Sequence, residues 1–481
     1  MQCNCSACSP DKIWLNGHLP LKHFFLGYFP FRLLLLCFAY PGSMKQRRKM
    51  SFIAWAMNFY YVVISPSTRP YKIMKVPEEE NYIKIMQIRA FCMIAKRGTI
   101  SEAANKLFRT QSAVTRSVRE LEYTLGVTLF ERHAAGMMIT DFGKCILPRA
   151  QRAIVELSQV PELLGKLRKR GGERREEAEP IWLFNTRRLE VFVALHRFHH
   201  TKTVAHALGV SQPAISASLK VLEKGADMSL FQRTARGMMP TPAGREIAPF
   251  ISRALNEIIH IKEDIAALKG VLTGNINIGA LPLSRTNLLP EAITRLITKH
   301  PSIRIYTNES AFSGLITDLR AGDVDFIIGA LRKEDDFFDT ENIVLFEEEL
   351  VMLVGPHHPL LHKTLEPQDL TSAQWILPRS KTPARRLLDK AFAERGLPPL
   401  QPVIESGDLA IVRGLLLRND MIAVVSSQQL SYELERDVLQ TLNYSLSDTR
   451  REIGLIFRKD SLHSPAASAL IETIKEMFSV G

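Results

Sequence analysis

TRRLEVFVALHRFHHTKTVAHALGVSQPAISASLKVLEKGADMSLFQRTARGMMPTPAGR, residues 186–245, decides the fold of the front part of the chain. Apolar residues recur at helical spacing in its first two segments, and Gly209 ends the second of them. Ser211 is a typical helix N-cap, and Pro213 lies in the first turn of a third helix, where its missing N–H group is harmless. The buried stripe expected for that third helix consists of Ala214, Ile215, Leu219 and Leu222.

The third helix is predicted to display polar side chains, because its buried stripe leaves Gln212, Ser216 and Lys220 facing outward. Two short helices joined by a turn with glycine form a helix-turn-helix, whose second helix can enter a major groove of DNA. A glutamine can pair bidentately with adenine, and a serine can contact a base or a phosphate. Arg233 and Arg236 come shortly before a glycine, and this arrangement suits a wing that rests on phosphates.

The same stretch occurs twice without a gap. Gln111 and Gln212 are equivalent, a difference of 101 positions, and the same offset relates Phe91 to Phe192. It continues as far as Glu156 and Glu257, so the copied unit includes the start of the helix that follows. A period this long indicates a duplicated domain and not a solenoid repeat.

Both copies resemble the winged helix-turn-helix of the LysR-type transcriptional regulators. That family's pattern runs A-A-x-x-L, S-Q-P-A-x-S-R, L-E, L-F-x-R and T-x-x-G. The first copy reads AANKL (103–107), TQSAVTR (110–116), LE (121–122), LFER (129–132) and TDFG (140–143). The second reads VAHAL (204–208), SQPAISA (211–217), LE (222–223), LFQR (230–233) and TPAG (241–244). With the C-terminal half, the resemblance covers about residue 86 to the end.

The resemblance implies a set of DNA-contacting residues in each copy. In the first copy these are Thr110, Gln111, Ser112, Thr115, Arg116 and Arg132. In the second copy they are Ser211, Gln212, Pro213, Ser216, Lys220, Arg233 and Arg236. Members of this family usually carry one such head, so the tandem is a departure from the family pattern.

The two copies also depart from the pattern in different ways. The first has Ser112 where the family usually has proline, but it keeps Arg116. The second keeps Pro213 and has Ala217 in place of that arginine. The second head is therefore expected to lack one cation on its reading face.

The charge of the chain is unevenly distributed. The 481 residues carry a formal net charge of +12, and a chain of this length is expected to form three or four units. Residues 81–175 contain 18 Lys and Arg against 8 Asp and Glu, whereas residues 271–481 contain 22 against 28. A basic front and an acidic back fit nucleic-acid binding at one end and a separate role at the other, although solvated helix faces alone would also explain the charge.

Residues 1–80 do not resemble the rest, and several readings compete. They hold four of the six cysteines and two apolar runs, at 24–40 and 51–65. In one alternative, residues 24–65 form a membrane hairpin that tethers a DNA-binding sensor to the membrane. This alternative is disfavoured because both runs fall short of ~18–20 uninterrupted apolar residues. A signal peptide and a cysteine metal site are weaker still. We expect an N-terminal extension without a fold of its own, and the sequence leaves open whether it belongs to the natural protein.

The domain organisation expected from these patterns has six parts. In residues 246–270, apolar residues recur at helical spacing. The corresponding helix pairs two subunits in LysR-type proteins. The alternative is a core helix that packs on its own head. The expected parts are an extension (1–80), winged helix-turn-helix 1 (81–145), a helix with Pro148 and Pro161 as kinks and a charged linker (146–185), winged helix-turn-helix 2 (186–245), a linker or dimerisation helix (246–270) and an effector-binding domain (271–481).

Beyond Gly274, strands alternate with helices, and this pattern predicts a parallel α/β sheet. It resembles the effector domain of the same family, a periplasmic-binding-protein-like pair of lobes, here expected at 275–354 with 446–481 and at 356–442. The chain is expected to cross between the lobes near Val354, Gly355 and Pro356. The segments GALPLS (279–284) and LRAGDVDFIIGALR (319–332) most resemble the corresponding sequences of members that sense aromatic acids or sugars. The predicted fold class is thus multidomain, with two helical winged helix-turn-helix domains, a linker helix and a two-lobed α/β effector domain.

A ligand in an open α/β sheet lies outside the carboxyl ends of the strands, where helix N-termini converge. The turn at 281–284 and the turn at 379–386 each precede a helix, so that Ser284 and Thr382 can help to hold a carboxylate. Both residues would otherwise be ordinary helix caps. The expected effector-binding residues are Leu283, Ser284, Gly329, Thr382, Pro383, Ser406 and Ser426.

The sequence favours a regulator over an enzyme. It contains no phosphate loop, no G-x-S-x-G and no H-E-x-x-H motif, and its histidines are scattered. We expect no cofactor and no bound metal. The expected partners are double-stranded DNA, a small organic acid as effector and a second copy or copies of the chain, as a homodimer or homotetramer. The expected location is the cytoplasm.

Overall fold

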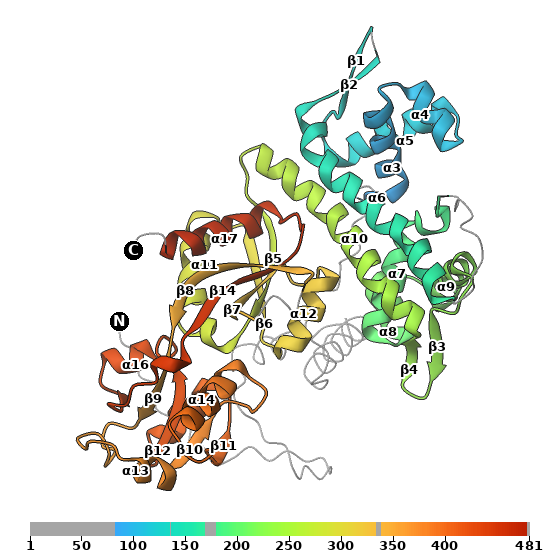
Figure 1. Cartoon of the computed structure of the whole chain (residues 1–481). Coiled ribbons are helices and arrows are strands. Elements are labelled where there is room, and N and C mark those ends of the chain that lie inside the picture. Colours follow the sequence, from blue (N-terminus) through green and yellow to red (C-terminus); the bar gives the residue numbers. More distant parts are fainter. Residues whose placement is uncertain (1–81, 135, 169–178, 333–337, 479–481) are drawn as a thin grey trace, which may run out of the picture. The chain divides into compact units, whose positions relative to one another are not determined.

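The computed structural model describes residues 82–134, 136–168, 179–332 and 338–478. The expectations for the N-terminal extension, its cysteines and its apolar runs lie outside these residues. Labels follow Figure 1.

The first head consists of three helices and a two-stranded hairpin. Its elements are α3 (Ile85–Arg97), α4 (Ile100–Leu107), α5 (Gln111–Leu125), β1 (Phe130–His133) and β2 (Gly136–Ile139), followed by the long helix α6 (Asp141–Leu167). Threonine side chains cap α4, α5 and α6 by accepting hydrogen bonds from backbone N–H groups in the first turn. Helix α6 runs continuously through Pro148 and Pro161, so neither proline breaks it.

The second head repeats the first, element by element. It consists of α7 (Thr186–Phe198), α8 (Thr201–Leu208), α9 (Gln212–Ala226), β3 (Phe231–Thr234), β4 (Gly237–Pro240) and α10 (Pro242–Leu268). Each of these bounds lies 101 positions after its counterpart, for example 186 after 85 and 268 after 167. One sequence-based expectation is wrong: Ala214 is exposed, and the buried stripe of α9 is Ile215, Leu219, Leu222 and Ala226.

Glycine fixes each wing against its own head. Gly136 and Gly237 begin the second strand of the two hairpins with φ of 129° and 111°, values that favour glycine. A Cβ atom there would lie 2.7 Å from the carbonyl oxygen of Gly98 and 2.4 Å from that of His199, respectively. Because those carbonyls end the first helix of each head, the wing starts directly on the helix end.

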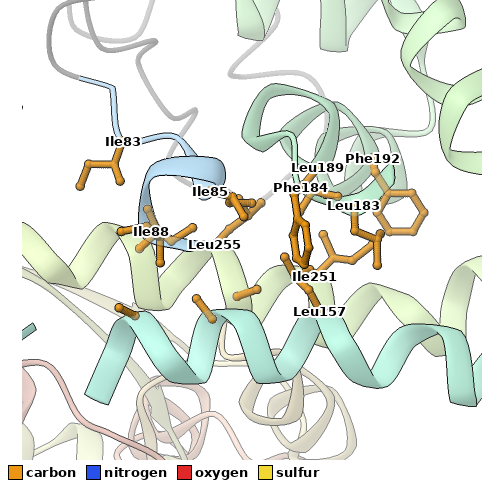
Figure 2. Close-up of a cluster of buried hydrophobic side chains, with 14 of the residues drawn as sticks. Ile83, Ile85, Ile88, Leu157, Leu183, Phe184, Leu189, Phe192, Ile251 and Leu255 are labelled. Atoms are coloured by element: carbon orange, nitrogen blue, oxygen red, sulfur yellow. The ribbon is translucent and has the colours of Figure 1, made fainter. Parts of the chain in front are cut away.

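The two heads share one hydrophobic core. A continuous cluster of buried side chains runs from Ile83 to Ile265 and includes residues of α3, α7, α6 and α10. Figure 2 shows part of it, with Ile85 and Ile88 of α3, Leu157 of α6, and Ile251 and Leu255 of α10. The described residues between 82 and 268 therefore form one folded unit with two heads.

The C-terminal part contains two five-stranded sheets, as expected for two lobes. The first sheet has the order β6-β5-β7-β14-β8. Its strands are β5 (Gly274–Ala280), β6 (Ile303–Asn308), β7 (Phe326–Ala330), β8 (Thr340–Glu348) and β14 (Arg451–Arg458), with α11 (Leu288–Lys299), α12 (Phe312–Ala321) and α17 (Pro465–Phe478). Strands β5, β6 and β7 pair parallel, as predicted, whereas β14 pairs antiparallel with both β7 and β8, so the complete sheet is mixed.

The second sheet has the order β11-β10-β12-β9-β13. Its strands are β9 (Leu350–Val354), β10 (Gln374–Leu377), β11 (Pro402–Glu405), β12 (Met421–Ser426) and β13 (Gln440–Thr441). Its helices are α13 (Pro367–Ser372), α14 (Pro383–Glu394), α15 (Leu409–Leu416) and α16 (Ser431–Glu435). Since β9 pairs antiparallel with β12, this sheet is mixed as well.

The crossover between the lobes lies at Glu349, and the expected position near Val354 to Pro356 is wrong. Strand β8 ends at Glu348 in the first sheet, and β9 begins at Leu350 in the second. The return is also later than expected, because Leu446 is buried in the core of the second lobe and β14 begins only at Arg451. One residue separates two strands of different sheets, which leaves no turn signal for a sequence pattern to detect.

Candidate functional site

The reading helix of the first head, α5, exposes most of the side chains expected to contact DNA. Thr110, Gln111, Ser112 and Arg116 are exposed and Thr115 is half-buried. Thr110 accepts a hydrogen bond from Ala113 N at 3.3 Å and thus caps the helix. The Nε2 group of Gln111 donates to Ser101 Oγ on α4 at 3.3 Å, so its amide is held only by another exposed side chain.

Arg116 forms an ion pair with Glu120 on the same helix. Its Nε donates to Glu120 Oε1 at 2.8 Å, and this bond holds the pKa of Glu120 below its usual value. The equivalent positions in the second head are Ala217 and Val221, which are both exposed. The second head therefore lacks this cation, as expected, and it also lacks the acidic partner of that cation.

The reading helix of the second head, α9, is built in the same way. Ser211 caps it by accepting a hydrogen bond from Ala214 N at 3.4 Å, and Pro213 lies in its first turn. Every residue expected to contact DNA on this helix is exposed, namely Ser211, Gln212, Pro213, Ser216 and Lys220. The two heads thus present equivalent surfaces with different side chains.

A half-buried glutamate anchors each wing by accepting backbone hydrogen bonds, a role that was not assigned from the sequence. Glu122 Oε1 accepts from Leu129 N at 2.7 Å and from Phe130 N at 3.3 Å. Glu223 Oε1 accepts from the equivalent N–H groups at 2.9 and 3.3 Å. The repeated L-E pair was a visible signal for this role. Beyond these anchors the wing arginines Arg132, Arg233 and Arg236 are exposed, where phosphates can reach them.

Phe108 is a second residue that the sequence analysis missed. It ends α4 with a φ of 51° and is 93% exposed. It lines a surface hollow together with Asn105, Arg109 and Thr110. The second head has Gly209 at the equivalent position, so this aromatic ring distinguishes the two heads.

Three of the expected effector residues lie together in the first lobe. Ser284 is fully buried in a short 3-10 helix, and its Oγ donates to the carbonyl of Leu281 at 2.9 Å. Gly329 has a φ of 152°, and a Cβ there would lie 2.6 Å from Leu281 Cβ. Leu283 packs with Ala330 and Ile453. Ser284 does not cap the next helix, whose N-cap is Asn287, so the interpretation of it as an ordinary cap is wrong.

Three further expected residues lie in the second lobe. Thr382 caps α14 through Arg385 N at 3.3 Å, with Pro383 as the first helical residue. Ser406 Oγ accepts from Asp408 N at 3.1 Å, and Asp408 in turn caps α15. The turns that precede α14 and α15 thus both carry polar side chains.

Ser426 occupies a different place, at the crossover between the lobes. It is buried and its Oγ donates to Glu348, whose other oxygen accepts from Arg451 Nε at 2.9 Å. Burial raises the pKa of Glu348, and the guanidinium of Arg451 opposes this rise. These partners are at the strand ends that connect the lobes, so Ser426 fixes the crossover.

Arg285 is a cation that the sequence analysis overlooked. Its Nε donates to the carbonyl of Ala280 at 2.8 Å and its Nη2 to that of Glu309 at 2.9 Å. Burial lowers the pKa of Arg285, whereas the carboxylates of Glu309 and Asp408 act in the opposite direction. Since Asp408 belongs to the second lobe, Arg285 lies within electrostatic reach of both lobes.

Neither a membrane helix nor a metal cluster is found in the described residues. No helix among them is long and apolar enough to cross a membrane. The same residues contain no group of three or more His, Cys, Asp or Glu side chains placed to hold a metal ion.

Two helical units with exposed reading helices, followed by a two-lobed α/β part, define a bacterial helix-turn-helix regulator. The model of the bacterial regulatory helix-turn-helix protein, lysR family, matches residues 85–144 and again 186–245, and the LysR substrate binding domain matches residues 269–479. The chain belongs to the LysR family and is a transcriptional regulator with an effector-binding domain. The resemblance stated from the sequence is thereby confirmed.

The chain is similar to relatives of two lengths. It is 49% identical over 395 residues to the HTH-type transcriptional regulator GalR of Pseudomonas putida. The aligned region covers 82% of this chain and 97% of that protein. It is 28% identical over 293 residues to the regulator GbpR of Azospirillum brasilense, which covers 60% of this chain and 85% of that protein. Because only 296 residues lie between 186 and 481, both ends included, an alignment of 395 residues extends into the first copy.

Solved structures of the family are also similar. A full-length OxyR variant from Pseudomonas aeruginosa matches with a TM-score of 0.48 and 22% identity, over 60% of this chain and 97% of that one. Full-length CbnR complexed with its target DNA matches with a TM-score of 0.45 and 19% identity, over 61% of this chain and 99% of that one.

Proposed function

We propose that both heads are winged helix-turn-helix DNA readers and that a small organic acid bound between the two lobes controls them. The observation that carries the first part is the exposed pair Gln111 and Gln212, at the same position of two reading helices. Each helix is capped, each wing is anchored by a glutamate, and each wing carries an exposed arginine. A spacer that had lost DNA binding would still need the caps and the anchors for its fold, but not the exposed glutamine and arginine. Since bacterial DNA lies in the cytoplasm, we place the chain there.

Selection of DNA from a random duplex library by the full chain tests this part. Footprinting of an enriched duplex should show a protected length that shrinks or weakens with Gln111→Ala and with Gln212→Ala. We expect each variant to relax base preference by ~1–3 kcal/mol. Gln159→Ala, which removes an exposed glutamine of α6, is the matched control. If Gln212→Ala leaves protected length and affinity unchanged, the second head is a structural spacer.

The second part of the proposal rests on groups of both lobes. Ser284 and Gly329 converge on Leu281 in the first lobe, with Arg285 next in the chain. Thr382, Pro383, Ser406 and Asp408 lie in two turns of the second lobe that precede helices. A partly buried cation and helix N-termini favour an anion, so a carboxylate is the effector chemistry that fits best.

Thermal-shift screening of aromatic acids and sugar acids with the full chain would identify the class. We expect one class to raise the unfolding midpoint, because a ligand that binds only the folded state stabilises it. Neutral sugars and aromatic alcohols are the matched controls. A larger shift with the neutral compounds than with the acids would contradict the proposed chemistry.

A further inference from the structure

Helices α6 and α10 pack antiparallel, and their ion pairs are reciprocal. Arg253 donates to Glu156 from Nε at 2.8 Å and from Nη2 at 2.7 Å. Arg152 Nε donates to Glu257 Oε1 at 3.2 Å. Arg152 and Arg253 occupy one position of the duplicated unit, and Glu156 and Glu257 occupy another, 101 residues apart in each case. Contact of residue i with j and of j with i is the signature of a two-fold interface.

A second contact lies where such an axis would pass. Ile85 N donates to Thr186 Oγ1 at 2.9 Å, and these residues are the same position in the two copies. Equivalent residues meet each other only close to a two-fold axis. The shared core is consistent with this arrangement, because it includes side chains of both long helices, α6 and α10, which are equivalent in the two copies.

The apolar face of α10 is consequently already covered. Its side chains Ile247, Ile251, Leu255, Ile258, Ile261 and Ile265 are buried within the chain itself. The sequence suggested that this helix pairs with a second subunit, whereas here α6 of the same chain occupies that face. A linker-helix pair between subunits would have to break this core.

We propose that one chain is a complete pair of DNA readers, related by an internal two-fold axis, and binds one operator with two unlike half-sites in inverted orientation. This rests on the proposed function of both heads. Two-fold related readers match inverted half-sites in DNA. The half-sites differ because the readers differ, with Ser112, Arg116 and Arg119 in one and Pro213, Ala217 and Lys220 in the other. Association of chains through the C-terminal part would then join pairs that are already complete.

Charge reversal distinguishes pairing within one chain from pairing between chains, without DNA. Glu156→Arg and Arg253→Glu each place like charges together in the full-length chain and should lower the thermal unfolding midpoint. The doubly substituted chain restores the pair in cis and should recover most of the loss. A coexpressed mixture of the two single variants can restore it only in trans, and we expect no recovery.

Recovery by the mixture as complete as that of the double variant would overturn the proposal. If the single variants do not accumulate as folded protein, the yield of folded protein provides the same comparison. Recovered yield in the double variant alone supports pairing in cis, and recovered yield on coexpression overturns it.

The operator is tested on duplexes enriched from a random library by the full wild-type chain. The expected duplex has two unlike inverted half-sites, of which Gln111→Ala relaxes one and Gln212→Ala the other. Mass measurement of the complex should give one chain for each pair of half-sites. Two chains for each pair, or both substitutions acting on the same half-site, would overturn the proposal. Absence of any enriched duplex would instead contradict the proposed DNA-binding function, and the cis and trans comparison would still stand.

Discussion

Arg149 of α6 pairs with Asp264 of α10, although the equivalent positions in the other copies of these helices are Phe250 and Leu163. Arg149 also donates to Glu257 at 3.0 Å and to the carbonyls of Leu462 and His463 at 3.1 and 2.7 Å. The symmetry of the head pair is thus broken where the C-terminal part contacts it. One buried cation joins both long helices to the loop before α17.

Arg149→Met should be strongly destabilising. The guanidinium is almost completely buried, and its removal leaves the carboxylates of Asp264 and Glu257 with fewer partners in a buried site. Breaking a buried pair in this way costs ~3–5 kcal/mol. Urea unfolding measures the loss, and Arg152→Met, which removes a more exposed cation of the same helix, is the control. Equal losses for the two variants would contradict the assigned role of Arg149.

Glu122→Ala should loosen the first wing. The carboxylate accepts the N–H groups of Leu129 and Phe130, and loss of the acceptor leaves buried donors unsatisfied at a cost of ~1–3 kcal/mol. Glu122→Gln keeps an acceptor oxygen and should cost less. Hydrogen exchange of the residue 129 and 130 amides measures the effect directly. Exchange that is equally fast in both variants would show that the carboxylate does not hold the wing through this bond.

Arg116→Ala should weaken DNA binding across sequences. A phosphate contact contributes ~0.9 to the slope of log K against log salt, so its loss should flatten that slope by about this amount. Glu120→Gln is the complementary variant, because it frees Arg116 from its ion partner and should strengthen binding at low salt. Affinity measured over a salt series tests both. Unchanged or stronger binding by Arg116→Ala, or weaker binding at low salt by Glu120→Gln, would rule out this role for Arg116.

Ser284→Ala should weaken binding of the acid identified by thermal shift. Loss of a charge-assisted hydrogen bond costs ~1.5–3 kcal/mol of affinity, and Arg285→Ala should cost at least as much. Ser464→Ala, which removes a buried serine that holds the start of α17, is the matched control. Calorimetry with unchanged affinity for both Ser284→Ala and Arg285→Ala would remove the first lobe from the site.

His463 should make the chain less stable in mild acid. Burial, together with Arg458, Arg149 and Lys475, lowers the pKa of His463 to about 4. An unfolded histidine binds its proton near pH ~6.5, so the unfolded state gains protons first as the pH falls. The folded state therefore loses up to ~3 kcal/mol between pH ~6.5 and about 4.

His463→Gln should reduce this loss, whereas His206→Gln, at an exposed position of α8, serves as the control for histidine removal. The free energy of unfolding measured at a series of pH values gives the comparison. An unchanged difference between wild type and His463→Gln across that range would contradict the prediction.

The heads could be predicted from the sequence because their signals are local. N-cap residues such as Thr110 and Ser211, and the turn glycines, lie next to the elements that they delimit. The partner of α10 could not be predicted in the same way. A long apolar face indicates that the helix packs against a partner, but it does not show whether that partner belongs to the same chain. The reciprocal charges at 152, 156, 253 and 257 were present in the sequence, yet only their geometry shows that they pair.

The crossover and the effector residues show a different limit. Glu349 separates two strands without glycine or proline, so no local signal marks the change of sheet. Ser284 was chosen for its place between a strand and a helix, whereas its neighbours Leu281 and Leu283 pack against Gly329 and Ile453, which lie far from them in the chain. Arg285 was missed because its half-buried position and its hydrogen bond to the carbonyl of Glu309 arise from folding and leave no pattern in the sequence.

The internal pairing of α6 with α10 also changes what a single mutation can do. In a regulator assembled from two identical subunits, a substitution in the reading helix alters both halves of the recognition sequence at once. Here the residues at 111 and 212 are encoded separately, so one half can drift while the other stays constant. On the proposed pairing, a substitution in one reading helix changes one half of the recognition sequence while the chain keeps its recognition of the other half.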